Sequence, residues 1–277
     1  MADVIREVCS CPVRTVGASR RGGVRVVIRK AQVEASEQAA GDQTTLVGHC
    51  YRTIKQDIIR GTRPPGERLR IEKLRTAYGM GTSPIREALQ RLTGDGLVRV
   101  LERRGFQVAP IELAEFFDLN MARTEVELSA LRLSMMHGDD GWEAGIVAAA
   151  YRLEKGDILL GRSDTAAFDE WEELNRTFHA SLLAACPSRW LLRARDALND
   201  QCERYRRASV FPARSERNLL QEHKDIAEAV LAKDVPLAER RLREHFSQTA
   251  AGLERALSDD RASGATELPL REGFPST

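Results

Sequence analysis

Apolar residues in the region 111–257 recur at spacings of three and four, the period of a helix with one buried face. The spacing predicts helices at about 113–135, 142–155, 165–183, 189–207, 215–232 and 236–257. The packing side of the first is marked by Leu113, Phe117, Met121, Leu128, Leu131 and Met135. That of the fourth is marked by Leu191, Ala194, Leu198 and Cys202. Because this region shows no convincing strand pattern, it predicts an all-α antiparallel helical bundle.

The sequence before the predicted bundle, from about residue 46, indicates a helix-turn-helix. After a first helix at Leu46–Arg60, apolar spacing indicates a second helix over 71–78, which Gly79 can end in the left-handed conformation. The next helix is expected to begin with Ser83 as its N-cap and Pro84 at its first helical position. These features match two helices joined by a tight turn.

This last helix has two distinct faces. Ile85, Leu89 and Leu92 form an apolar stripe, whereas Arg86 and Gln90 fall on another face. One face is therefore expected to pack, and the other is available to a ligand.

A β-hairpin is expected directly after the helix-turn-helix. Residues 97–101 suit a short strand, 103–105 a turn and 106–108 a returning strand. The predicted domain is therefore a winged helix-turn-helix, of α+β type, whose wing has a basic tip.

These patterns divide the chain into four parts. Residues 1–45 have little apolar periodicity and are expected to form a disordered extension, with a basic DNA-contacting arm as the alternative. Residues 46–110 form the winged helix-turn-helix, 111–257 the helical domain and 258–277 a disordered tail. The predicted fold class is mainly α.

Charge supports this division. The net charge of the chain is only +1, but basic residues outnumber acidic ones over 46–112, and acidic residues outnumber basic ones over 113–277. The basic part is the one that carries the predicted helix-turn-helix, and positive charge favours binding to the phosphates of DNA.

Composition excludes several other classes. No run approaches the roughly 18 apolar residues of a membrane span, and the N-terminus lacks the apolar core of a signal peptide. We therefore expect a cytoplasmic protein without a membrane partner. The five cysteines show no paired spacing, which argues against zinc-ribbon and thioredoxin-like sites.

Double-stranded DNA is the first partner that the sequence predicts. Arg86 lies near the start of the helix that follows Gly79. It is the best candidate for a base contact, because a guanidinium can bind guanine bidentately. Arginines at the wing tip would contact phosphates. The candidate DNA-binding residues are Lys73, Thr82, Ser83, Pro84, Arg86, Gln90, Arg103, Arg104 and Gly105. The alternative is a small α+β domain whose arginines are only solvated.

Histidines are placed unusually in the helical region. His179, His223 and His245 occupy the apolar stripes of three different predicted helices, and Asn175 lies one turn before His179. Three imidazoles and one side-chain oxygen suit a divalent transition metal, with zinc as the first choice and nickel or manganese as alternatives. The competing interpretation is that each histidine is a core residue with a local partner.

The segment 46–108, above all Ser83-Pro84-Ile85-Arg86-Glu87-Ala88-Leu89, resembles the DNA-binding domain of GntR-type transcription regulators. The resemblance implies a winged helix that docks on DNA. The chain departs from the usual family pattern at Gly81 and Thr82, where Ser and then Arg are common.

The segment from Leu113 to about Leu253 resembles the all-helical ligand-binding (FCD) domain of the FadR-like branch of that family. The resemblance implies a metal held at Asn175, His179, His223 and His245, beside a small organic acid. Asn175 departs from the aspartate of the family. Arg123 matches an arginine that often faces the effector; a surface salt bridge with Glu127 is the alternative.

The expected function is therefore regulation, not catalysis. The leading hypothesis is a homodimeric transcription regulator, a repressor, that binds a palindromic operator and responds to a small carboxylate effector near a metal. The alternative is a metal-dependent hydrolase with a nucleic-acid-binding domain. It lacks an evident general base in a motif such as His-Glu-x-x-His. A weaker third hypothesis is an architectural DNA binder without an effector.

Overall fold

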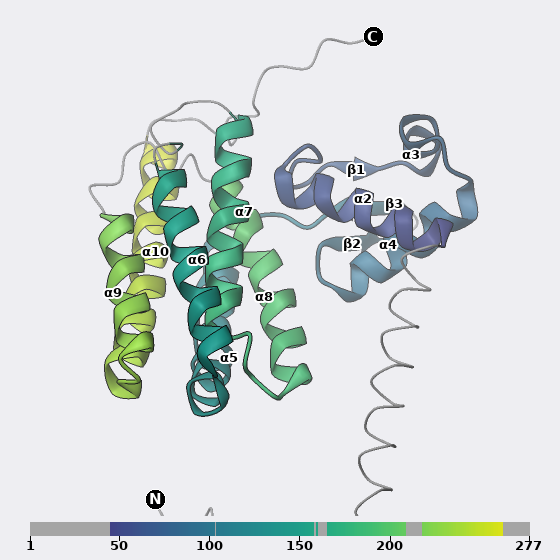
Figure 1. Ribbon diagram of the computed structural model, residues 1–277. Coiled ribbons are helices and arrows are strands. Elements are labelled where there is room, and N and C mark those ends of the chain that lie inside the picture. The colour runs from purple at the N-terminus through teal and green to yellow at the C-terminus, as the bar shows by residue number, and fades with distance from the viewer. Residues whose placement is uncertain (1–44, 103, 158, 160–164, 209–217, 263–277) are drawn as a thin grey trace, which may run out of the picture. The chain divides into compact units, whose positions relative to one another are not determined.

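The computed structural model describes residues 45–102, 104–157, 159, 165–208 and 218–262, and side chains of the last helix up to residue 255. The described chain is mainly helical, with one small sheet (Figure 1). This confirms the predicted fold class. None of the described helices combines the length and the apolar character required to cross a membrane. Residues 1–44 of the extension predicted at 1–45, and residues 263–277 of the tail predicted at 258–277, lie outside the described residues. Residues 258–262 of that predicted tail are helical.

Three helices form the helix-turn-helix domain: α2 at Leu46–Arg60, α3 at Ile71–Tyr78 and α4 at Thr82–Gly94. Gly79 ends α3 with φ of 64°, in the left-handed region where a residue without Cβ avoids a steric penalty. The shared core is apolar and includes Ile54, Leu74 and Leu89, each no more than 1% exposed. Burial of these side chains holds the three helices together.

The wing is a three-stranded antiparallel sheet in the order β1-β3-β2. Its strands are β1 at Arg68–Leu69, β2 at Val98–Leu101 and β3 at Gly105–Val108. Gly105, at the tip, has φ of 89°, which a side chain would strain. The hairpin was predicted, whereas the pairing of β1 with β3 was not.

The start of α4 differs from the prediction. The helix begins at Thr82, and its N-cap is Gly81, which has no side chain to accept a hydrogen bond. Ser83 therefore lies inside the first turn, where its hydroxyl is 3.3 Å from Oε1 of Glu87. The expected cap at Ser83 and the expected place of Pro84 at the first helical position were wrong.

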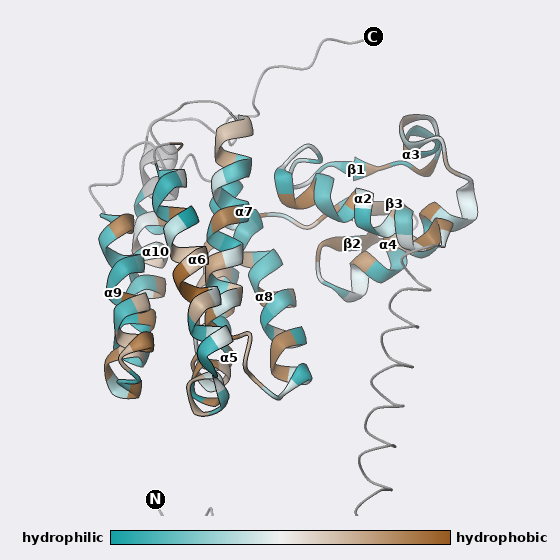
Figure 2. Ribbon diagram, viewed as in Figure 1, coloured by the Kyte–Doolittle hydropathy of each residue, from teal (hydrophilic) through white to brown (hydrophobic). Residues whose placement is uncertain are grey.

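Six labelled helices make up the helical domain, as expected, and lie side by side in Figure 1. They are α5 Leu113–His137, α6 Asp140–Gly156, α7 Thr165–Leu182, α8 Arg189–Ala208, α9 Leu219–Leu231 and α10 Val235–Ala262. Helix α5 packs against α8 and α10, α6 packs against α7 and α9, and α9 also packs against α10. Figure 2 shows polar and apolar residues alternating around these helices, as amphipathic packing requires.

The predicted packing faces of α5 and α8 are only partly correct. Leu128, Leu131 and Met135 on α5 are buried as expected, and so is Cys202 on α8. On α5, Phe116 is buried, whereas Phe117 and Met121 are 40% and 63% exposed. On α8, Ala194 is exposed, whereas its neighbour Arg195 is 3% exposed. The apolar residues alone did not define these faces, because both helices also bury polar side chains.

Two helix ends differ in position. Helix α9 begins at Leu219 with Asn218 as its N-cap, where the carboxamide oxygen accepts from the Gln221 N–H. The predicted start at residue 215 lies outside the described residues. Helix α10 continues to Ala262, five residues beyond its predicted end at Leu257.

Gly138, directly after α5, has no room for a side chain. A Cβ there would lie 2.0 Å from Cε3 of Trp142, whose ring is buried and also contacts the Lys233 ammonium at 4.4 Å from the ring centroid. We expect Gly138→Ala to lower the free energy of unfolding by about 1–3 kcal/mol, because the indole must move within a packed core. Thermal unfolding measures this as a lower Tm.

Gly145→Ala is the matched control, since Gly145 lies within α6 and a Cβ there meets nothing within 4 Å. Alanine is the better helix former, so this change should stabilise the fold by up to about 1 kcal/mol. Equal Tm values for the two variants would contradict the steric argument.

Candidate functional site

Helix α4 presents a polar surface. Ile85, Ala88 and Leu89 are fully buried, whereas Arg86 and Gln90 are exposed on the opposite side. Thr82 and Ser83 are also exposed at the start of α4, Lys73 is exposed on α3, and Pro84 is half-buried. The predicted DNA-contacting side chains of α4 therefore share its accessible face.

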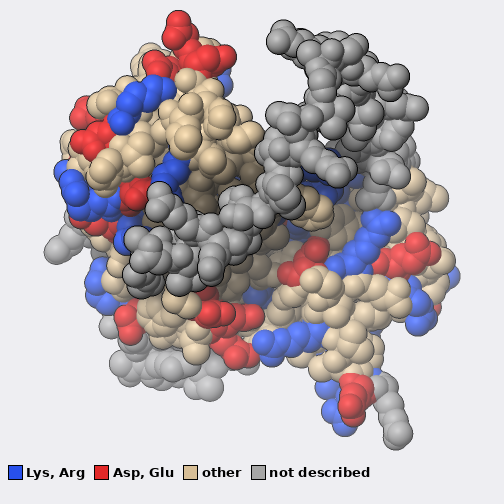
Figure 3. Space-filling view, turned by 90° about the horizontal axis from the view of Figure 1, so that it is seen from below, with Lys and Arg blue, Asp and Glu red and all other residues tan. Residues whose placement is uncertain are grey.

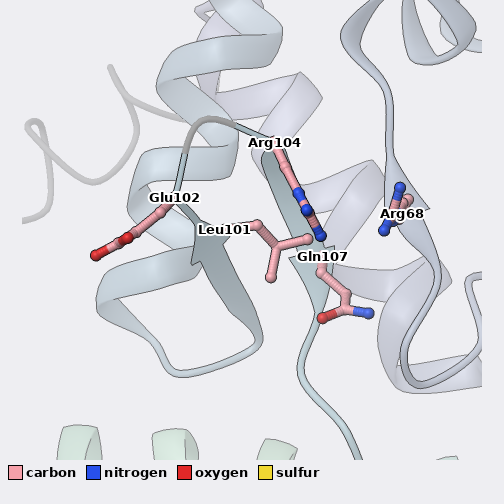
Figure 4. Close-up of a pocket in the computed structure, with 5 residues that line it drawn as sticks. All are labelled: Arg68, Leu101, Glu102, Arg104 and Gln107. Atoms are coloured by element: carbon pink, nitrogen blue, oxygen red, sulfur yellow. The ribbon is translucent and has the colours of Figure 1, made fainter.

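The wing carries a shallow open pocket that the sequence did not indicate. It is lined by Arg68, Leu101, Glu102, Arg104 and Gln107. Figure 4 shows Glu102 turned away from the other four side chains. Arg68 joins this surface because β1 pairs with β3, which sets Arg68 opposite Gln107. The predicted Arg103 lies outside the described residues, and Gly105 is exposed.

Surface charge is otherwise mixed. On the face drawn in Figure 3, basic and acidic side chains are interspersed over the described surface. No single broad basic field is visible on that face.

The three predicted histidines meet in the core of the helical domain. His179 comes from α7, His223 from α9 and His245 from α10, and each is at most 6% exposed. One ring nitrogen from each lies within 4.8 Å of the other two. The ring centroids of His223 and His245 are 4.9 Å apart, and those of His179 and His245 are 5.1 Å apart. These residues are called the histidine cluster below.

The surroundings of His179 favour its neutral imidazole form. Burial lowers the pKa of His179 well below its ordinary value, and the positive charges of His245, Arg123, His223 and Arg195 lower this pKa further. A neutral imidazole nitrogen can donate its lone pair to a metal.

Two further side chains extend the cluster. Nδ1 of His245 is 2.8 Å from Oε2 of Glu222, a contact that fixes the orientation of the ring. Glu222 adjoins His223 in sequence, yet it contacts His245 on another helix, so sequence reasoning missed it. Asn175 is 6% exposed on the same face of α7 as His179, and its Oδ1 has no hydrogen-bond partner among the described residues.

A buried ion-pair cluster adjoins the histidines. Nε of Arg123 donates to Oε1 of Glu127 at 2.7 Å, and Nε of Arg195, on α8, lies 3.6 Å from the same oxygen. All three side chains are at most 4% exposed. The salt bridge between Arg123 and Glu127 that the sequence offered as the alternative is therefore present, but it is buried and not at the surface. The Arg123 guanidinium also stacks 4.2 Å from the ring centroid of Phe246.

Phe246 connects this cluster to the histidines, because its ring centroid is 5.6 Å from that of His179. A single aromatic ring, that of Phe246, therefore separates Arg123 from the histidine cluster. Sequence reasoning singled out Arg123 but missed Arg195, whose polar side chain did not fit the apolar stripe assigned to α8.

A winged helix-turn-helix combined with an all-helical domain that carries a polar core defines the class of DNA-binding transcription regulators with a ligand-binding domain. Two family models match the chain: "Bacterial regulatory proteins, gntR family" over residues 46–108 and "FCD domain" over residues 118–248. The chain belongs to the GntR family and carries an FCD domain.

Curated relatives agree with this assignment. The chain is 34% identical to the uncharacterized HTH-type transcriptional regulator BphR of Paraburkholderia xenovorans (strain LB400), over 79% of this chain and 90% of BphR. It is 33% identical to the HTH-type transcriptional repressor GlaR of Escherichia coli (strain K12), over 78% of this chain and 98% of GlaR.

Solved structures show the same fold. E. coli McbR/YncC matches with a TM-score of 0.64 at 22% identity, covering 76% of this chain and 98% of that protein. A putative GntR transcriptional regulator from Rhodococcus sp. RHA1 has the same TM-score at 20% identity, covering 77% of this chain and 99% of that chain.

Glu127 is the carboxylate shared by the buried guanidinium groups of Arg123 and Arg195. Its removal in Glu127→Ala leaves the guanidinium groups of Arg123 and Arg195 buried without their shared carboxylate. We expect the free energy of unfolding to fall by about 3–5 kcal/mol, the usual cost of breaking a buried ion pair from one side. Denaturant unfolding followed by circular dichroism measures it.

Glu125→Ala, two residues earlier on α5, is the control. Glu125 pairs with Arg243 at 2.9 Å, but their side chains are 60% and 56% exposed. An exposed pair contributes at most about 1 kcal/mol. A Glu127→Ala variant as stable as Glu125→Ala would rule out the dependence on Glu127.

Proposed function

We propose that this protein is a homodimeric, effector-controlled repressor of transcription. Two winged helices would bind the half-sites of a palindromic operator, and a small organic acid beside a metal would change operator affinity. The observation that carries the proposal is the meeting of three buried histidines from three helices next to a buried guanidinium, in a chain with an exposed reading helix.

The proposed DNA contacts divide into two kinds. Arg86, with Thr82, Ser83 and Gln90 on the exposed face of α4, would read base edges in the major groove. Arg104 and Gly105 at the wing, together with Arg68 beside them, would bind phosphates and position the domain without reading sequence. One winged helix offers few base contacts, which is why a symmetric dimer is expected.

The residues of the histidine cluster fit a divalent metal. Ligand nitrogens within 4.8 Å of one another require only small torsional changes to reach a common ion about 2 Å from each. The unpartnered Oδ1 of Asn175 supplies a fourth donor on the same face as His179. Zinc suits this donor set, and nickel or manganese are alternatives. A metal held there would supply positive charge that attracts a carboxylate.

Arg123 is the proposed carboxylate ligand of this protein. Its guanidinium is held by Glu127 and by the Phe246 ring, so little rotamer entropy remains to be lost when an acid binds. Effector control then requires that the acid bind more tightly to one conformation than to the other, typically by about 1–3 kcal/mol.

Arg86→Ala should weaken binding to a duplex selected from a random pool by about 1–3 kcal/mol, while affinity for unselected DNA stays nearly unchanged, because a base contact is lost. Arg104→Ala should weaken both and reduce the slope of log affinity against log salt by about one. Gel retardation over a salt series gives both values.

Arg86 would be a phosphate contact, and not a reading residue, if Arg86→Ala lowered affinity for selected and unselected DNA equally. A monomer without sequence preference would overturn the proposed function as a whole, and steady turnover of an ester panel would favour the metal-dependent hydrolase instead.

For the metal, we expect one divalent ion per chain after titration of the purified protein with zinc, nickel or manganese. His223→Ala should lose stoichiometric binding, and Asn175→Asp should tighten it, because a carboxylate adds a full negative charge to the donor set. Removal of the ion with a chelator should lower the Tm.

His137→Ala is the matched control, since His137 is exposed at the end of α5 and outside the histidine cluster. If His223→Ala and His137→Ala bind metal alike, or if no stoichiometric ion is found by elemental analysis, the histidines are core residues or direct effector contacts.

A further inference from the structure

Helix α8 directs unpaired hydrogen-bond donors into the protein. Arg195 and Asn199 lie one turn apart, and they are 3% and 2% exposed. Nε and Nη2 of Arg195 and Nδ2 of Asn199 have no hydrogen-bond acceptor among the described residues. Buried donors without acceptors are unfavourable and uncommon in folded proteins.

These donors share one chemical preference. Arg195 donates through Nη1 to Oδ1 of Asp196 at 3.1 Å and reaches Glu127 only at 3.6 Å, too far for a hydrogen bond. A guanidinium has donors and no acceptor, and the unpaired group of Asn199 is its N–H₂. The group that satisfies this face must therefore offer several acceptor oxygens, as a carboxylate does.

The α8 donors belong to the same region as the histidine cluster. Glu127 contacts Arg195 on one side and Arg123 on the other, and Arg123 stacks on Phe246 beside His179.

Charge in this region would become unbalanced with a metal bound. Two buried guanidinium groups share the carboxylate of Glu127, the exposed Asp196 also pairs with Arg195, and Glu222 lies beside His245. The proposed metal ligands are neutral, so a divalent ion would leave a positive excess over the two carboxylates of Glu127 and Glu222. One carboxylate would not neutralise it, whereas two would come closer, and buried uncompensated charge is unfavourable.

We propose that Arg195 and Asn199 form a second anion subsite and that the effector is a small dicarboxylate. One carboxylate would face Arg123 and the histidine cluster, and the other would accept hydrogen bonds from Arg195 and Asn199. This inference rests on the proposed function, because it names the class of acid that the effector site binds.

The test compares straight-chain acids of matched length: succinate with butyrate, glutarate with pentanoate and adipate with hexanoate. Isothermal titration of the zinc-loaded full-length chain measures their affinities. We expect at least one dicarboxylate to bind about ten- to a hundredfold more tightly than its monocarboxylate counterpart, the change that corresponds to a charge-assisted contact.

Asn199→Asp is the most informative variant. The substitution is nearly isosteric and places a carboxylate beside Arg195, so folding should be retained, but that carboxylate repels the second carboxylate of the ligand. The dicarboxylate preference should disappear while monocarboxylate affinity stays the same. Arg195→Gln should act in the same direction, and Arg193→Gln, at an exposed position of α8, should leave the preference unchanged.

The outcomes separate the two proposals. Equal affinity for both acids of every pair would overturn the second subsite and leave the carboxylate effector standing. Preserved preference in Asn199→Asp would overturn the assignment to α8. Binding of no acid in either series would overturn the effector site itself, and with it this inference.

Discussion

The buried carboxylate of Glu127 is the interaction on which the helical domain depends. It is the shared partner of guanidinium groups from α5 and α8, at 2.7 and 3.6 Å, and all three groups are removed from water. Charges in such surroundings are tolerated only when they are paired, so this carboxylate fixes how α5 and α8 face each other. Phe246, on α10, contacts both Arg123 and His179 and so links these charged groups to the histidines.

Local patterns were sufficient for most of the fold. The bounds of α2 were predicted as observed, and the helix-turn-helix and wing followed from Gly79, the apolar stripe of α4 and the alternation of β2 and β3. The start of α4 was misplaced because Gly81 caps the helix with its backbone alone. Sequence could not reveal β1, since a two-residue strand exists only through its pairing with β3.

The candidate site was half visible in the sequence. Histidines on apolar stripes stand out, because a polar residue at a core position needs a reason. Arg195 and Asn199 escaped because Ala194 and Leu198, each one residue earlier, made an equally regular stripe on α8. A prediction based on apolar spacing does not detect polar residues that face inward. The buried face of α8 is decided by its packing against α5.

The unsatisfied donors also indicate how a bound acid would influence the rest of the protein. Buried N–H groups of Arg195 and Asn199 on α8 lack acceptors among the described residues. A ligand that supplies those acceptors stabilises the conformation in which α5, α8 and the histidine helices come together. By thermodynamic reciprocity, a conformation of the DNA-binding domain that opposes this arrangement would weaken the ligand to the same extent that the ligand weakens DNA binding. The free energy for control would thus come from completing a polar core that the chain leaves incomplete.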